Sequence, residues 1–143
     1  MFFASGAGLG YVPFASGTFG SLLGIAFHFL LVALTASLAA QAGVLVLAVL
    51  AAIWLAGRAE VLLEDHDSGK IVLDEIVGMA IALLGFAPTL RNVIVLFALF
   101  RVLDVLKVWP ASWIDRRMTG GSGVVLDDVV SGVYANLLAR VIL

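Results

Sequence analysis

The sequence contains no cysteine and only a small number of charged residues. The lack of cysteine excludes thiol catalysis, a disulfide framework and thiolate metal sites, and it leaves the redox compartment undetermined. Lysine and arginine together number 8 and aspartate and glutamate 10, so the formal net charge is −2. Basic residues this few and this scattered make no surface for nucleic acid, and we expect no nucleic-acid partner.

Charged residues make up 13% of the 143 residues, whereas hydrophobic residues make up 63%. A soluble domain of this length needs more polar side chains to cover its surface. The composition therefore predicts a single membrane-embedded domain over residues 1–143, with a very apolar soluble helical bundle as the alternative. The first twenty residues have no basic region of the kind that begins a signal peptide, so we expect no cleavable leader.

Apolar runs divide the chain into four or five segments, which predict an all-α integral membrane bundle of about four to five helices. A membrane-spanning helix needs about 20 apolar residues, and the first segment meets this length, whereas the others are borderline or carry charges. The first two segments show no alternation of apolar and polar residues, which argues against membrane strands. The predicted segments cover approximately residues 21–40, 42–57, 71–88, 92–109 and 124–143.

The links between these segments differ in charge, and the difference predicts which side of the membrane each link faces. Short cytoplasmic loops are enriched in lysine and arginine. The links after the second and fourth segments hold five basic residues, namely Arg58, Lys70, Lys107, Arg116 and Arg117. The link between the third and fourth segments holds only Arg91. We therefore expect both charged links and the N-terminus to lie in the cytoplasm.

Two nearly identical phrases, "IVLDEIV" at 71–77 and "VVLDDVV" at 124–130, each place adjacent carboxylates within an apolar run. Both are predicted helix starts near the cytoplasmic boundary, and Asp104 lies at the same boundary. Carboxylates gathered at one depth repel each other unless a cation intervenes, and oxygen ligands without cysteine suit Mg²⁺ or Mn²⁺ rather than Zn²⁺. The alternative is that these are solvated acids favoured by the helix dipole. The candidate metal ligands and catalytic acids are Asp74, Glu75, Asp104, Asp127 and Asp128.

Three charged residues recur at every third position in "LFRVLDVLKVWP" at 99–110. Arg101 and Asp104 share one helix face, where they either neutralise each other or act separately on a phosphate and a metal. Arginine suits forked contacts to phosphate oxygens. Lys107 either binds phosphate as well or extends along the apolar surface to reach water.

Two glycine-rich stretches are further candidates for anion binding. "FASGTFGSLLG" at 14–24 leads into the first helix, and the free N–H groups of a helix start bind anions. Its Thr18 and Ser21 serve either this purpose or an ordinary N-cap. "DRRMTGGSG" at 115–123 is interpreted as a flexible basic loop in which Arg116 contacts a phosphate or only adds positive charge to a solvated turn.

The sequence resembles the bacterial phosphatidylglycerophosphatase A family in blocks that follow the family's order. These blocks are "GTFGSLLG", "HDSGKIVLDEIVGM" and "LFRVLDVLKVWPASWIDRRMTGGSGVVLDDVVSGVYA", and they span most of the chain from residue 17 to residue 135. The family tends to have proline where Ser16 and Val108 stand. The resemblance points to the five acids, to Arg101 and Lys107, and to the N-terminal block with Thr18 and Ser21.

The resemblance also implies an activity and a location. It implies a magnesium-dependent phosphatase that removes the phosphate of phosphatidylglycerophosphate, a phospholipid, to give phosphatidylglycerol. It further implies a multi-pass protein of the bacterial cytoplasmic (inner) membrane, and the loop charges put the site on the cytoplasmic side.

The residues by themselves leave the mechanism and the class of function open. A metal-activated water and an aspartyl-phosphate intermediate both fit carboxylates beside basic side chains. A small ion-coupled transporter is one alternative, because repeated acidic helix starts can mark a duplicated ion path. A phosphatase of another lipid phosphomonoester and a scaffold protein with purely topological charges are the others. The oligomeric state is not indicated.

Overall fold

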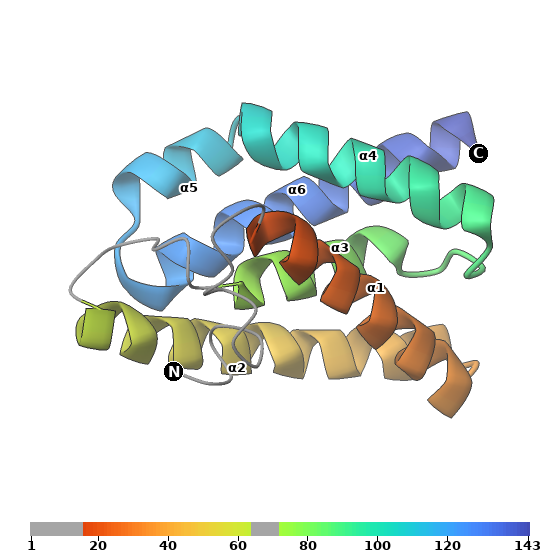
Figure 1. Cartoon of the computed structure of the whole chain (residues 1–143), viewed down its shortest axis with the longest axis horizontal. Helices are drawn as coiled ribbons and strands as arrows, with labels where there is room; N and C mark the ends of the chain where they lie inside the picture. Colours follow the sequence, from red (N-terminus) through yellow and green to blue (C-terminus); the bar gives the residue numbers. More distant parts are fainter. Residues whose placement is uncertain (1–15, 64–71) are drawn as a thin grey trace.

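The computed structural model describes residues 16–63 and 72–143, and the regular secondary structure in these two ranges is entirely helical (Figure 1). The helices are α1 (Ser16–Leu34), α2 (Leu38–Leu63), α3 (Leu73–Leu83), α4 (Leu90–Leu106), α5 (Ala111–Arg117) and α6 (Gly120–Ile142). The five predicted segments correspond to α1–α4 and α6, so the all-α prediction is confirmed. The short α5 was missed because its sequence, "ASWIDRR", contains no apolar run.

Several predicted boundaries were wrong, because hydropathy does not register where helices are capped. The first segment was expected over residues 21–40, but α1 covers Ser16–Leu34 and residues 38–40 belong to α2. Ser37 caps α2, since its Oγ accepts a hydrogen bond from the backbone N–H of Ala40 at 3.2 Å. The flexible loop expected over 115–123 is also wrong, because residues 115–117 end α5 and residues 120–123 begin α6.

Helix α3, the shortest of the five helices that correspond to predicted segments, lies at the centre of the bundle and packs against α1, α2, α4 and α6 (Figure 1). Its 11 residues give a length of about 17 Å, well below the ~30 Å of a hydrocarbon core. The side-chain amide of Asn136 on α6 donates hydrogen bonds to the carbonyl oxygens of Ala82 and Leu84, both at 2.8 Å. These bonds give a partner to two carbonyl groups at the end of α3, where the helix itself supplies none or too few donors.

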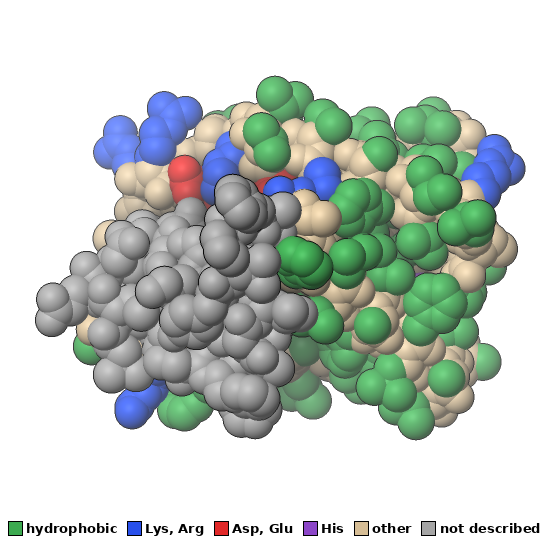
Figure 2. Space-filling model, in the orientation of Figure 1, with side chains coloured by type: hydrophobic (Ala, Val, Ile, Leu, Met, Phe, Trp, Pro, Cys, Tyr) green, Lys and Arg blue, Asp and Glu red, His purple; other side chains and the backbone are tan. Residues whose placement is uncertain are grey.

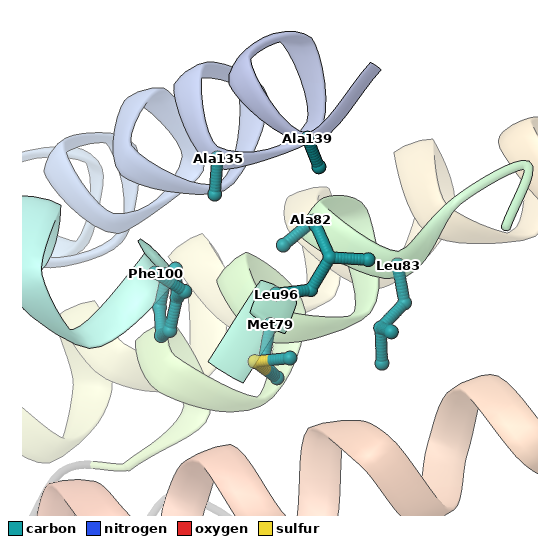
Figure 3. Packing of buried hydrophobic residues seen from close by; sticks show 7 residues of the cluster. All are labelled: Met79, Ala82, Leu83, Leu96, Phe100, Ala135 and Ala139. Atoms are coloured by element: carbon teal, nitrogen blue, oxygen red, sulfur yellow. The ribbon is translucent and has the colours of Figure 1, made fainter. Parts of the chain in front are cut away.

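Small residues allow α3 and α6 to approach each other closely. A Cβ atom added to Gly132 would lie 2.3 Å from the carbonyl oxygen of Gly78, which no larger residue could accommodate. Beside this contact, alanines of α3 and α6 pack against larger side chains of α3 and α4 (Figure 3). Close contact through small residues is a main source of helix association in lipid. The packing fixes the ends of α3, α4 and α6 relative to one another.

Helices α1 and α2 each contain a window long and apolar enough to cross a membrane, Gly17–Leu34 and Leu38–Arg58. Only 28% of the first window and 17% of the second are buried inside the chain. A core helix of a soluble protein buries most of its apolar side chains, so this exposure favours a membrane protein over a very apolar soluble bundle. Figure 2 shows one face of the molecule, where hydrophobic side chains cover much of the described surface.

Candidate active site

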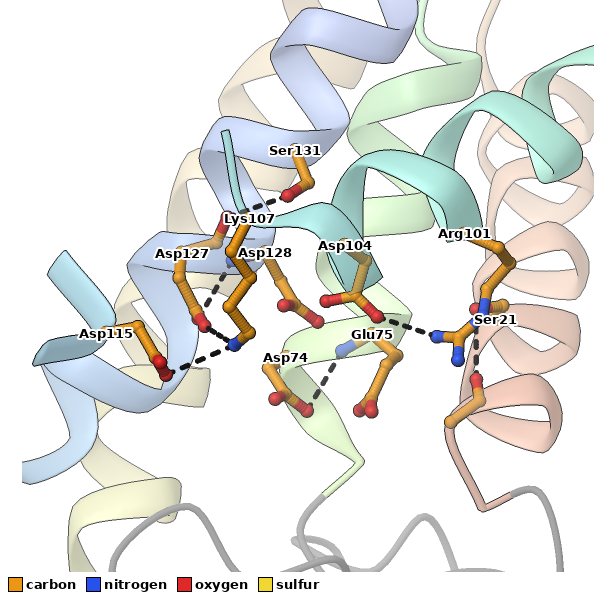
Figure 4. Close-up of polar contacts among 11 residues, drawn as sticks. Ser21, Asp74, Glu75, Arg101, Asp104, Lys107, Asp115, Asp127, Asp128 and Ser131 are labelled. Atoms are coloured by element: carbon orange, nitrogen blue, oxygen red, sulfur yellow. Dashed lines mark hydrogen bonds and ion pairs between the residues drawn. The ribbon is translucent and has the colours of Figure 1, made fainter. Parts of the chain in front are cut away.

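The five acids, Arg101 and Lys107, all identified in the sequence, lie close together (Figure 4). Helices α3 and α6 begin near them, and α4, which runs in the opposite direction, finishes there (Figure 1). Three helices from distant parts of the sequence therefore bring their acids to one place. The acids are Asp74 and Glu75 from α3, Asp104 from α4, and Asp127 and Asp128 from α6.

Asp74, Glu75 and Asp128 form the acid cluster, in which one oxygen of each carboxylate lies within 4.8 Å of the others. Asp74 is only 4% exposed and Asp128 only 2%. Within residues 16–63 and 72–143, the buried Oε2 of Glu75 and Oδ2 of Asp128 have no hydrogen-bond partner. Buried carboxylates at this separation repel each other strongly when no cation is near. The all-oxygen donor set and its two unpartnered atoms fit a hard divalent cation such as Mg²⁺.

Asp104 borders the acid cluster from α4. Its carboxylate is close enough to Glu75 and Asp128 to interact electrostatically with both. It also accepts a hydrogen bond from Nη1 of Arg101 at 2.9 Å, so the expected Arg101–Asp104 pair is present. Asp104 therefore connects the acid cluster to the nearest guanidinium group.

The prediction that both acid pairs lie at helix starts is correct for α3 and wrong for α6. Helix α6 begins at Gly120, so Asp127 and Asp128 lie about two turns inside it. Both are 2% exposed, which rules out the solvated-acid alternative for this pair. Hydropathy placed the start of α6 too late, because "TGGSG" at 119–123 is typical of a loop.

The two acidic phrases share a local structure but differ in their partners. In each phrase the first carboxylate accepts a hydrogen bond from the next backbone N–H: Asp74 from Glu75 at 3.0 Å, and Asp127 from Asp128 at 2.9 Å. Asp74 belongs to the acid cluster, whereas the Asp127 carboxylate forms an ion pair with Lys107. The repeat therefore does not give two equivalent halves of one site.

Lys107 occupies the C-cap of α4 in the left-handed conformation, with φ 48°. Its Nζ forms ion pairs with Asp127 on α6 and with Oδ1 of Asp115 on α5, the latter at 3.1 Å. Burial alone would lower the pKa of Lys107, but the two carboxylates outweigh it and raise the pKa. The ammonium group therefore stays charged and joins three helices. Asp115 was not among the predicted site residues. The turn between α4 and α5 brings it to Lys107, and such a turn produces no periodic pattern in the sequence.

The start of α1 lies beside Arg101 and Glu75. A Cβ atom on Gly17 would lie 3.0 Å from both Nη atoms of Arg101 and 3.1 Å from Oε1 of Glu75. The Arg101 side chain is 25% exposed, so its guanidinium group is accessible to a ligand. The first turn of α1 and Arg101 thus lie beside the acid cluster.

The remaining phosphate-binding candidates are placed differently. Ser21 is fully buried in the second turn of α1 and its Oγ donates to the carbonyl oxygen of Gly17 at 3.0 Å, so it is not an N-cap. Thr18 lies half-buried in the first turn. Arg116 is exposed on α5, where its Nε donates to the carbonyl oxygen of Ser112 at 3.2 Å. Thr18 and Ser21 therefore lie on the two turns of α1 that start beside Arg101, and the structure records no contact of these residues or of Arg116 with the described acids.

Comparison with known proteins adds independent findings. The family model described as Phosphatidylglycerophosphatase A matches residues 2–143. The chain is 39% identical over 134 residues to Phosphatidylglycerophosphatase A of Escherichia coli K12, covering 92% of the chain and 76% of that protein. It is 34% identical over 140 residues to the Haemophilus influenzae protein of the same name, covering 92% and 81%. It is 40% identical over 144 residues to a Bacteroides thetaiotaomicron protein named "Putative phosphatidylinositol-3-phosphatase", covering 96% and 89%. No solved structure matches the chain.

Proposed function

The chain belongs to the phosphatidylglycerophosphatase A family, and we propose that it hydrolyses the phosphate monoester of phosphatidylglycerophosphate to phosphatidylglycerol and phosphate. The observation that carries the proposal is the buried acid cluster beside the partly exposed Arg101. Such an arrangement provides ligands for a cation and a fork for phosphate oxygens within one site.

Mg²⁺ is the proposed cofactor, and Asp74, Glu75 and Asp128 are the residues that would hold it. When bound, it supplies positive charge that stabilises the phosphate and lowers the pKa of a water molecule. Asp104 has a different part, since its bond to Arg101 holds the guanidinium group beside Glu75 and the acid cluster. Arg101 then neutralises the charge that develops on the phosphoryl oxygens.

The first turn of α1 is proposed to complete the phosphate site. The backbone N–H groups of a helix's first turn and the positive end of the helix dipole favour an anion. Gly17 leaves room there, because a side chain at this position would press on Arg101 and Glu75. Thr18 belongs to the same turn and is the candidate for a hydroxyl contact.

Lys107, expected from the sequence as a phosphate ligand, is better suited to positioning. Its ammonium group already contacts the carboxylates of Asp115 and Asp127. The pair with Asp127 holds the end of α4 against α6, next to Asp128. Lys107 is therefore proposed to hold Asp127 and the neighbouring Asp128 in place, whereas Arg101 is proposed to bind the phosphate.

We place the site at the cytoplasmic face of the bacterial inner membrane. The supporting observation is that Lys107 and the two arginines of α5, Arg116 and Arg117, lie at the same end of the bundle as the acids (Figure 1). A substrate whose acyl chains stay in the bilayer then has to bring only its headgroup to the acid cluster. The meeting of both acidic phrases in one cluster also favours an enzyme over an ion path that would run through the membrane.

A second candidate substrate, which differs in its headgroup, is a phosphorylated inositol lipid. The name of the Bacteroides thetaiotaomicron relative refers to a phosphorylated inositol lipid, and this relative is as similar to the chain as the Escherichia coli protein is. Both substrates are phosphomonoesters on a lipid, so the acid cluster and Arg101 suit either one.

Phosphate release by the purified protein in detergent tests the proposal. We expect Mg²⁺-dependent hydrolysis of phosphatidylglycerophosphate that a chelator abolishes and added Mg²⁺ restores. Asp74→Asn and Asp128→Asn should each lower kcat by about 100-fold or more, because each removes a ligand charge. Faster hydrolysis of phosphatidylinositol 3-phosphate would assign the chain to the second candidate. Full activity in both variants would refute the assignment of the site.

A further inference from the structure

We propose that the groove between α1 and α4 holds one acyl chain of the lipid whose phosphate occupies the acid cluster. This inference rests on the proposed function and adds a binding site for the apolar part of the substrate. The groove has a volume of about 300 Å³, and its lining residues are Leu22, Ile25, Val93, Ile94, Phe97 and Ala98. All six are apolar, as a binding site for a hydrocarbon chain requires.

The groove adjoins the phosphate end of the site. On α4, Ala98 and Phe97 lie three and four residues before Arg101, which is one helical turn on the same side. On α1, Leu22 directly follows Ser21 at the site end of the helix. A lipid with its phosphate at Arg101 would therefore lead its acyl chain directly into the groove.

The contact between Gly17 and Arg101 lies at the polar end of the groove. A Cβ atom on Gly17 would lie 3.0 Å from the guanidinium nitrogens, so α1 and α4 meet there without an intervening side chain. Further along, the same two helices are separated by the groove. A charged end and an apolar continuation match the two parts of one phospholipid molecule.

A second apolar groove does not meet these conditions. It has a volume of about 290 Å³ and lies between α2, α3 and α6, where its α2 lining covers residues 42–50. At the site end, α2 meets α6 where a Cβ atom on Gly57 would lie 3.3 Å from the backbone nitrogen of Gly121. The α2 lining of this groove is therefore about two turns or more from the site end. Its α6 lining, Val129, follows Asp128, but no residue of α1 or α4 lines this groove, so a chain bound there would not be continuous with a phosphate at Arg101.

Filling the α1–α4 groove tests the inference. Ala98 is exposed within the groove, and Ala98→Phe places a ring where the acyl chain would lie. Ala51→Phe is the matched control, because Ala51 is also exposed but lies on α2 outside the lining of both grooves. The two readouts are the KM for dioleoyl phosphatidylglycerophosphate in mixed micelles and the inhibition constant of its deacylated headgroup.

Ala98→Phe should raise the KM for the dioleoyl lipid about three- to tenfold. The effect is moderate because the chain exchanges lipid contacts for protein contacts and gains only packing. The inhibition constant of the deacylated headgroup should stay unchanged, and Ala51→Phe should resemble the wild type in both. Ala98→Leu, with its smaller side chain, should show the same separation if the phenylalanine variant does not fold.

Three results would overturn the inference, and they differ in what they say of the function. Equal KM values for Ala98→Phe and Ala51→Phe, with an active wild type, refute the groove and leave the proposed function intact. An equal loss for lipid and deacylated headgroup in both Ala98 variants places the effect in the site and also refutes the groove. A wild type that does not hydrolyse the lipid refutes the proposed function and the groove with it.

Discussion

Replacing Lys107 with methionine tests whether this residue holds the acid cluster in place. Asp127 is 2% exposed and its ion-pair partner Lys107 is 29% exposed, so the pair is largely removed from water. Removing one partner of a buried ion pair costs about 3–5 kcal/mol, because the other charge loses its compensation. The pair between Lys107 and Asp115 is more open, with Asp115 32% exposed, and such a pair contributes about 0–1 kcal/mol.

The two ion pairs therefore predict unequal effects on the free energy of unfolding. Lys107→Met should lower it by roughly 3 kcal/mol, whereas Asp115→Asn should lower it by no more than about 1 kcal/mol. The double variant Lys107→Met/Asp127→Asn should regain part of the loss, because the buried charge is removed as well. Unfolding in mixed micelles with increasing denaturing detergent, followed by circular dichroism, measures all three.

The pH dependence gives a second measurement on the same pair. The folded pKa of Lys107 is raised, so its contribution is complete below the unfolded value of about 10.4 and falls as the pH rises above it. The difference in unfolding free energy between the wild type and Lys107→Met should therefore be constant from pH 7 to pH 9. Equal stabilities for Lys107→Met and Asp115→Asn, or a difference that vanishes within this range, would refute the reasoning.

Three further predictions concern the phosphate side, the start of α1 and the end of α3. Arg101→Ala should lower kcat/KM about 100-fold in the phosphate-release assay, because it removes the guanidinium group beside the acids, whereas Arg91→Ala at the exposed start of α4 should leave it unchanged. Gly17→Val should reduce activity with little loss of helicity, since its side chain would displace the guanidinium group; wild-type activity would contradict the close contact. Asn136→Leu should lower the free energy of unfolding by about 1–3 kcal/mol, because the carbonyl oxygens of Ala82 and Leu84 lose the Asn136 amide as a donor. An unchanged free energy of unfolding would show that these hydrogen bonds do not stabilise the fold.

Much of the fold class could be predicted because it depends on local properties of the sequence. Long apolar runs without alternation predict helices and do not fit strands, and the five runs reappear as α1–α4 and α6. Helix ends were predicted less well, because they depend on side-chain bonds such as Ser37 to the N–H of Ala40 and Asn136 to the end of α3. The second of these bonds joins residues 54 apart in the sequence, which no local pattern records.

The candidate site was predicted in its composition but not in its pairing. The acids, Arg101 and Lys107 were chosen because charges within apolar runs are costly unless they have a function. The role of Lys107 was not foreseen, since its partner Asp115 lies on the unpredicted helix α5. Arg116 was included for its charge alone, and among residues 16–63 and 72–143 its recorded bond is to Ser112 on its own helix.

The sequence by itself determined that this protein is helical, strongly apolar and acidic at a few chosen positions. Length and order of apolar runs are enough for that, because burial of apolar surface and backbone hydrogen bonding act locally along a helix. The tertiary structure decided which carboxylates meet. Adjacent helix positions point about 100° apart, so the two acids of a pair face different neighbours. The close contact of Gly78 with Gly132 determines how α3 lies against α6. In this arrangement Asp128 lies with Asp74 and Glu75 in the acid cluster, whereas Asp127 forms an ion pair with Lys107.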